Sequence, residues 1–266
     1  MVEPLKELNQ ICQKPRYREV GNWMVRHFLR DAALPVTWLL LHTSVTANQV
    51  TIISLIMGLV GIYFFAIPSA GFFLTGAILL ELWYFLDHVD GQIARYRKTA
   101  CLSGRFFDFI THHLIHGVIF FSLGLYALQV TGKLFCVLLG FTASVAMIFF
   151  NLTSDTKYKT FVEALIDSGR SIKIDKGASR PESKGALNLF QSIYSTLHKL
   201  SEIHVLMNLL TLFAFLEFVM KIKFDFRYGV LIFYGLAVPV LTLVKITYLI
   251  SKRKIDEEFH FLFRPV

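Results

Sequence analysis

The sequence has 266 residues, of which 55% are hydrophobic and only 17% are charged, with a formal net charge of +8. A soluble domain of this length would carry more charge, and its apolar residues would not gather in blocks of about 18 to 25 that can cross a hydrocarbon core of about 30 Å. The composition therefore excludes an ordinary soluble enzyme and predicts an all-α, polytopic integral membrane protein. In such a protein a basic excess marks cytoplasmic loops and contacts with anionic membrane lipids, so we expect no nucleic-acid partner.

Residues 1–44 are expected to form a cytoplasmic N-terminus with an amphipathic helix that lies in the headgroup layer. The first residues are polar and mixed in charge, so they do not read as a cleaved signal peptide. Within 16–31 the side chains of Trp23 and Phe28 share one helical face and most arginines lie elsewhere, which is typical of an interfacial helix. Residues 34–42 are apolar but too short to span a membrane, and they complete this element.

Six candidate transmembrane helices follow, with glycine or proline at or near several of their ends. Their approximate bounds are 46–67, 71–94, 105–128, 133–154, 203–220 and 228–250. We expect them to form one membrane domain over 45–250, followed by a cytoplasmic tail over 251–266. The loop 155–202 is the least membrane-like part: a helix runs out of the fourth span, a mobile stretch follows at 170–185, and 186–200 has the pattern of a second interfacial helix.

Lysine and arginine residues predict the orientation of the spans. The N-terminal region, the bend between the second and third spans, the loop 155–202 and the tail are all basic, whereas the first opposite connection carries no charge. Lys221, Lys223 and Arg227, in the last opposite connection, are the discordant group. We therefore expect both termini and residues 87–113 on the cytoplasmic side, and the lack of a signal peptide favours a bacterial inner membrane.

A cluster of acids and small residues stands out at the adjoining ends of the second and third spans. At helical spacing, on one face of each span, lie Asp87, Asp90, Gly91, Ala94, Gly104, Asp108 and His112. A short bend joins the spans, so they run antiparallel, and three converging carboxylates would repel one another unless a divalent cation such as Mg²⁺ or Mn²⁺ lay between them. Since the small residues leave room for phosphate, the cluster predicts a diphosphate site at the membrane edge. The alternative is that the acids are solvated and pair with Arg95, Arg97 and Lys98.

The same residues resemble the signature of the CDP-alcohol phosphotransferase (CDP-alcohol phosphatidyltransferase) family. That signature is D-x-x-D-G-x-x-A-R, eight residues, and then G-x-x-x-D-x-x-x-D; residues 87–112 match it at every position except the last, where His112 replaces an aspartate. A weaker likeness lies at 47–51, where A-N-Q-V-T is similar to the family's P-N-x-x-T without its proline. The motifs cover residues 45–128, and only the six-span layout extends the likeness further.

The resemblance implies a transferase of phospholipid synthesis. Such an enzyme moves a phospho-alcohol or phosphatidyl group from a CDP-linked donor, with CDP-diacylglycerol favoured, to an alcohol acceptor and releases CMP. The resemblance further implies Mg²⁺ or Mn²⁺ held by Asp87, Asp90, Asp108 and His112. It implies a nucleotide-diphosphate pocket lined by Gly91, Ala94, Arg95, Gly104, Asn48 and Thr51. Since members of the family often pair, it also favours a homodimer.

The histidine at the last signature position leaves three hypotheses open, because the family's fourth acid is its proposed general base. A neutral imidazole accepts a proton near neutral pH, so His112 can act with Asp108 in a working transferase, as base or as ligand. Alternatively, water replaces the alcohol and the protein hydrolyses CDP-lipids, or the site is degenerate and a non-catalytic protein binds a lipid or acts as a scaffold. A transporter is less favoured, because no broken helices are predicted. Nearby, we expect His113 to pack or contact headgroups, His116 to lie on the site face and His88 to face solvent.

Overall fold

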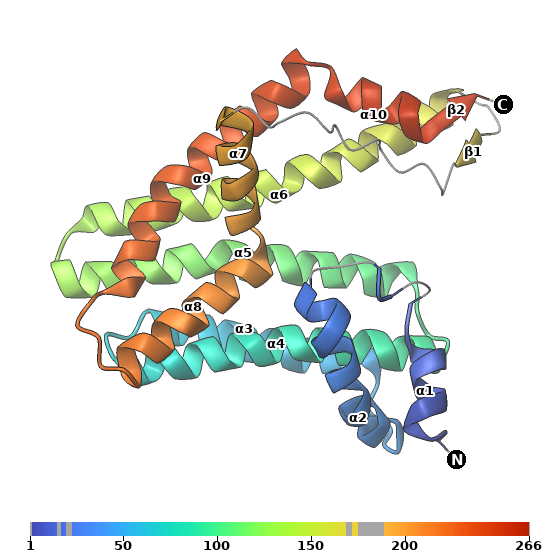
Figure 1. The fold of residues 1–266 in the computed structure, drawn as a ribbon, viewed down its shortest axis with the longest axis horizontal. Helices are drawn as coiled ribbons and strands as arrows, with labels where there is room; N and C mark the ends of the chain where they lie inside the picture. The colour runs from blue at the N-terminus through green and yellow to red at the C-terminus, as the bar shows by residue number, and fades with distance from the viewer. Residues whose placement is uncertain (1, 15–16, 20–22, 169–171, 175–188, 266) are drawn as a thin grey trace.

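The computed structural model describes residues 2–14, 17–19, 23–168, 172–174 and 189–265, which form a bundle of long helices (Figure 1). Five of the described helices are long and apolar enough to cross a membrane. They are α3 (Ala47–Phe65), α4 (Ala70–Tyr96), α5 (Leu102–Thr131), α6 (Leu134–Ser168) and α9 (Phe226–Ser251). Their positions agree with five of the six predicted spans, and α6 runs out of the fourth span as expected. The protein is therefore an all-α, multi-pass membrane protein.

The remaining predicted span is part of a bent pair of helices. The apolar helix α8 (Ile203–Phe218) is long enough to span only together with α7 (Leu189–Leu200), from which it is bent by 70°. The bend falls at Ser201 and Glu202, where the Ser201 hydroxyl donates to the Leu197 carbonyl at 2.9 Å. The break coincides with the boundary between the predicted interfacial helix at 186–200 and the predicted span at 203–220. The sequence predicted both helices, but periodicity within each of them carries no information on the angle between them.

The N-terminal region packs against the end of α4 that leads into α5 (Figure 1). Its first helix, α1 (Leu5–Cys12), buries Leu8 and Cys12 completely, and the Tyr96 hydroxyl of α4 donates to a Glu3 carboxylate oxygen at 2.6 Å. Helix α1 was not predicted from the sequence, although Leu5, Leu8 and Cys12 recur at helical spacing, because the element is only eight residues long. Its docking brings the following residues close to the end of α4.

The predicted interfacial helix is largely present. A π-helical turn (Val25–Leu29) continues into α2 (Arg30–Leu41). Trp23 and Phe28 are 69% and 64% exposed, which suits a face turned to lipid headgroups. Residues 15–16 and 20–22 of the predicted helix lie outside the described residues.

The C-terminal residues fold back along α6. Helix α10 (Lys254–Leu262) is tied to α6 by an ion pair of 2.8 Å between Lys157 Nζ and Glu258 Oε1. Two three-residue strands, β1 (Ile172–Ile174) and β2 (Phe263–Pro265), pair antiparallel beside them. The expected mobile stretch at 170–185 lies mostly outside the described residues. The predicted tail is thus a docked element.

One of the discordant basic residues is a core residue. Arg227 is 2% exposed, and it donates to Glu217 Oε1 at 3.2 Å and to the Ile67 carbonyl at 2.6 Å. Its guanidinium lies 3.6 Å from the centre of the Tyr126 ring. A buried charge needs such partners. Arg227 therefore does not count as a loop cation when the orientation is predicted from charge.

Helices α5 and α6 approach closely at two glycines. A Cβ atom on Gly140 would lie 2.6 Å from the Phe120 carbonyl oxygen and 2.9 Å from the Gly124 Cα. Small residues at such contacts let helices in a membrane pack backbone to backbone. This packing fixes α5, which carries part of the site described below.

Replacement of Gly140 by valine is expected to lower the free energy of unfolding by about 1–3 kcal/mol, because the added carbons meet backbone atoms that cannot move aside. The measurement is reversible unfolding in mixed detergent micelles. Gly71→Ala is the matched control, since a Cβ there would lie at an ordinary 3.5 Å from the Phe218 ring. Equal stability of the two variants would contradict the close contact.

Candidate active site between α4 and α5

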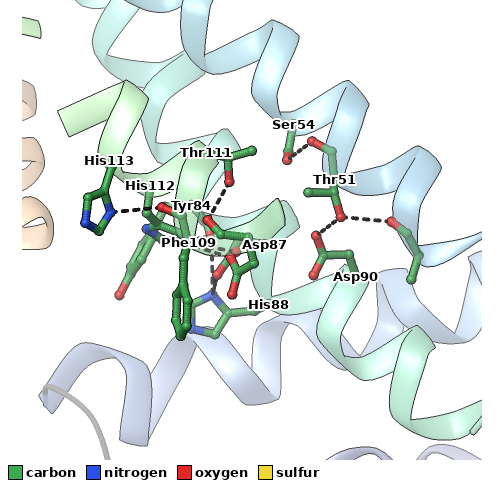
Figure 2. A network of polar contacts seen from close by, with 12 residues as sticks. Thr51, Ser54, Tyr84, Asp87, His88, Asp90, Phe109, Thr111, His112 and His113 are labelled. Atoms are coloured by element: carbon green, nitrogen blue, oxygen red, sulfur yellow. Dashed lines mark hydrogen bonds and ion pairs between the residues drawn. The ribbon is translucent and has the colours of Figure 1, made fainter. Parts of the chain in front are cut away.

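A short bend sets the predicted faces of α4 and α5 against each other. Cys101 caps α5 at its first turn, and its Sγ accepts a hydrogen bond from the Gly104 N–H at 3.4 Å. Because the helices run antiparallel from this bend, Asp87 of α4 lies beside His112 of α5 (Figure 2). Asp108 of α5 lies close to both of them. The structure therefore brings together three of the four predicted metal ligands.

These three side chains form a compact group that could hold a metal ion. One ligand atom from each of Asp87, Asp108 and His112 lies within 4.8 Å of the other two. His112 Nε2 is 3.1 Å from Asp87 Oδ1 and 3.3 Å from Asp108 Oδ1. The imidazole nitrogen thus occupies the space between two carboxylates, where a positive charge or a donor is required.

The group fits a divalent cation. Asp108 Oδ1 is buried and makes no hydrogen bond of good geometry, although it lies close to His112 Nε2. An unsatisfied buried carboxylate oxygen is costly unless a ligand completes its coordination. Two carboxylates and an imidazole suit Mn²⁺ or Zn²⁺ better than Mg²⁺, which prefers an all-oxygen set.

Asp90, the fourth predicted ligand, is hydrogen-bonded to a residue of another helix. Its Oδ2 accepts a hydrogen bond of 2.5 Å from the Thr51 hydroxyl of α3 (Figure 2). Asp90 is therefore not one of the three clustered residues, and its role as a ligand remains a prediction. The hydrogen bond also brings the start of α3 to the site, which is where the weaker N-x-x-T likeness lies.

A cavity of about 700 Å³ opens beside the cluster. All the residues predicted to bind the nucleotide diphosphate line it, namely Asn48, Thr51, Gly91, Ala94, Arg95 and Gly104. A Cβ on Gly104 would meet only the Cys101 Sγ, at 3.7 Å, and one on Gly91 would come nearest the Arg95 guanidinium, at 3.1 Å. Because both glycines line the cavity, a larger side chain at either position would reduce the space in it.

Five basic side chains line the same cavity, and they come from separate parts of the chain. They are Lys14, Arg30, Arg95, Arg97 and Arg105. Arg95 donates through Nε to the Cys12 carbonyl, and Arg97 donates to the carbonyls of Val45 and Thr43 at 2.5 and 2.8 Å. These bonds hold the guanidinium groups in place beside the site.

Sequence reasoning did not single out Lys14 and Arg30 as site residues. They reach the cavity only because α1 and α2 dock on α4, and nothing in the local pattern indicates that docking. Partial burial, together with the charges of Arg95 and Arg30, lowers the pKa of the Lys14 amino group. Cations that crowd one another in this way would be stabilised by an anion in the cavity.

Aromatic rings support the histidine of the cluster. The His112 ring lies 4.9 Å from the Trp83 ring and 6.5 Å from the Tyr84 ring, centre to centre. Trp83 is 1% exposed, so it forms a fixed wall behind the imidazole. His88 was expected to face solvent, and this is wrong: its side chain is 12% exposed and its Nδ1 lies 2.9 Å from the Tyr84 carbonyl. His88 lines the 700 Å³ cavity and lies against Tyr84 of its own helix.

The next two histidines of α5 contact α6. His113 Nε2 lies 2.7 Å from Asp155 Oδ2, so this histidine is paired with a carboxylate. His116 is buried, and its Nδ1 lies 2.9 Å from the Asn151 side-chain nitrogen. Both histidines line a second cavity, as does His112 itself, and none of these three histidines lines the 700 Å³ cavity.

The fold and the site define a class: a multi-pass helical membrane protein with a carboxylate–histidine cluster at the edge of a basic cavity. The chain belongs to the CDP-alcohol phosphatidyltransferase family, whose family model matches residues 44–177. The match confirms the resemblance seen in the signature at 87–112 and supports a transferase of phospholipid synthesis. A search of curated proteins finds no match.

Proposed function

We propose that this protein transfers a phosphatidyl or other phospho-alcohol group from a CDP-linked donor, with CDP-diacylglycerol favoured, to the hydroxyl of an acceptor and releases CMP. One observation carries the proposal: the group of Asp87, Asp108 and His112 adjoins a cavity that five basic side chains line. A diphosphate needs both features, because its charge must be matched by cations and its phosphorus must lie near the reacting groups.

The basic side chains and the start of α3 would bind the diphosphate, and the open space at Gly91 and Gly104 would let it approach the helices closely. A divalent cation held by Asp87 and Asp108, with Asp90 as a further ligand, would neutralise the diphosphate and make CMP a better leaving group. Where His112 is the base, its imidazole would not be a ligand of that cation, because the nitrogen that accepts the proton needs its lone pair. Charge matching of this kind, rather than covalent chemistry by the protein, is the main contribution in phosphoryl transfer.

His112 is the proposed base for the acceptor. Its imidazole lies between the two carboxylates and also lines the second cavity, so it can meet a hydroxyl that arrives from that side. The hydroxyl oxygen would form a bond to the phosphorus that carries the lipid, the bond from that phosphorus to CMP would break, and the hydroxyl proton would pass to the imidazole. We further propose that the site faces the cytoplasm, because the basic residues around it lie on one end of the bundle.

The test is CMP release by the purified protein in lipid nanodiscs, with CDP-diacylglycerol and water-soluble CDP-alcohols as donors and several alcohols as acceptors. We expect release that depends on an alcohol, stops when EDTA removes divalent cations, and returns on addition of Mn²⁺ or Mg²⁺. Release without any alcohol would identify a CDP-lipid hydrolase. Absence of release from every donor would reject the transferase and favour the non-catalytic alternative.

A further inference from the structure

His112 lines a second cavity, of about 340 Å³. Side chains of α5, α6 and α9 line it together with residues at the bend between α7 and α8. The bend places Glu202 and His204 in the wall of this cavity. At the end of α7 the Leu200 carbonyl accepts a hydrogen bond from the Tyr234 hydroxyl at 2.7 Å. Broken helices in membrane proteins commonly line polar cavities, since only there can an interrupted backbone find partners.

The cavity holds donors and acceptors suited to hydroxyl groups. His116 is buried in its wall, with Nδ1 2.9 Å from the side-chain nitrogen of Asn151, and its Nε2 makes no hydrogen bond of good geometry to the described residues. If the Asn151 amide donates to Nδ1, then Nε2 carries the proton and is a buried donor in need of an acceptor. A hydroxyl oxygen of a ligand would meet that need.

The charges of the cavity disfavour phosphate. Its carboxylates are Asp155, which lies 2.7 Å from His113, and Glu202, which lies 3.3 Å from His204. Against these two acids stands one lysine, Lys245, so the carboxylates of the cavity outnumber its ammonium groups.

Two of the three N–H donors of Lys245 already make hydrogen bonds within the protein. Lys245 is 9% exposed, and its ammonium donates to the Phe150 carbonyl at 2.7 Å and to the Ser154 hydroxyl at 3.0 Å, which leaves a single N–H. Among the described residues that line this cavity there is no arginine. The first cavity, by contrast, sets five basic side chains against three carboxylates.

We infer that the second cavity binds the acceptor and selects an alcohol that carries no phosphate, either a small polyol or an amino alcohol. A phosphate monoester carries about −1.5 to −2 charges near pH 7 and requires arginine forks or several free N–H donors. A neutral polyol can bond to the imidazoles and carboxylates, and an ammonium group would complement the negative charge. The assignment of this ligand as the acceptor rests on the proposed function; the preference against phosphate rests on the cavity alone.

The experiment compares matched pairs of alcohols and their phosphate esters: glycerol with glycerol 3-phosphate, and inositol with inositol 3-phosphate, with ethanolamine added as the amino alcohol. With CDP-diacylglycerol as donor, at least one unphosphorylated alcohol should stimulate CMP release and its ester should not. Glu202→Gln should raise the KM for that alcohol by about tenfold or more, with little change in the KM for the donor. Stimulation by the esters at equal or lower concentration would overturn the inference.

Glu163→Gln is the matched control, because Glu163 is 61% exposed on α6, pairs with Lys159 at 3.7 Å, and lines neither cavity. A second readout does not depend on turnover: thermal unfolding of the full chain in the presence of each alcohol or ester. The unphosphorylated alcohol should stabilise the wild type at lower concentration than its ester, and Glu202→Gln should reduce that stabilisation. If no donor yields CMP, the proposed transferase activity is rejected. The order in which alcohols and their phosphate esters stabilise the protein still tests whether the second cavity prefers a ligand without phosphate. No stabilisation, or the reverse order, rejects that preference.

Discussion

Asp108→Asn is expected to lower CMP release by more than about 100-fold, since loss of a partner outside the ligand shell already costs 10–100-fold at many metal sites. Asparagine keeps the shape of the side chain but removes the charge from one of the three grouped ligand atoms. The wild type should also gain thermal stability on addition of Mn²⁺, and this gain should be lost in the variant. The stability readout separates loss of the metal from loss of a catalytic step.

The control for this substitution is Asp256→Asn on α10. The Asp256 side chain is 59% exposed and pairs with Arg253 at 3.4 Å. Asp256 lines neither the first nor the second cavity. The Asp256→Asn variant should retain the activity and the Mn²⁺ response of the wild type. If Asp108→Asn did the same, the carboxylate–histidine group would not be the metal site.

His112→Gln is expected to reduce kcat by about 10²–10⁴-fold, because glutamine offers polar atoms but cannot take a proton from the acceptor. The KM for the donor should change little, since most of the diphosphate contacts come from the first cavity, which His112 does not line. Steady-state CMP release over a range of donor concentrations separates the two constants. His112→Asp restores the acid of the family signature and should recover part of the lost rate.

His42→Gln is the matched control for this histidine. His42 ends α2, its ring lies 4.4 Å from the Trp38 ring, and it lines neither cavity. It should behave as the wild type. A silent wild type that becomes active as His112→Asp would identify a site that has lost its chemistry, and a fully active His112→Gln would assign the base elsewhere.

The sequence by itself determined the spans and the core of the site. Apolar blocks of membrane length predicted five long helices and the apolar helix α8, because the thickness of the hydrocarbon core fixes helix length whatever the neighbours are. Helical spacing and a short bend were enough to predict that Asp87, Asp108 and His112 meet, since both constraints are local. The glycine-containing signature then indicated the family, which the family model confirms.

Only the tertiary structure decided how distant segments complete the site. Lys14 and Arg30 reach the first cavity because α1 and α2 dock on α4, and Asp90 is drawn toward Thr51 because α3 packs beside it. The bend between α7 and α8 forms a wall of the second cavity, which no periodicity predicts. Spacing along a helix determines which side chains share a face. Which faces meet depends on the packing of side chains from segments far apart in the chain, and that information is not local.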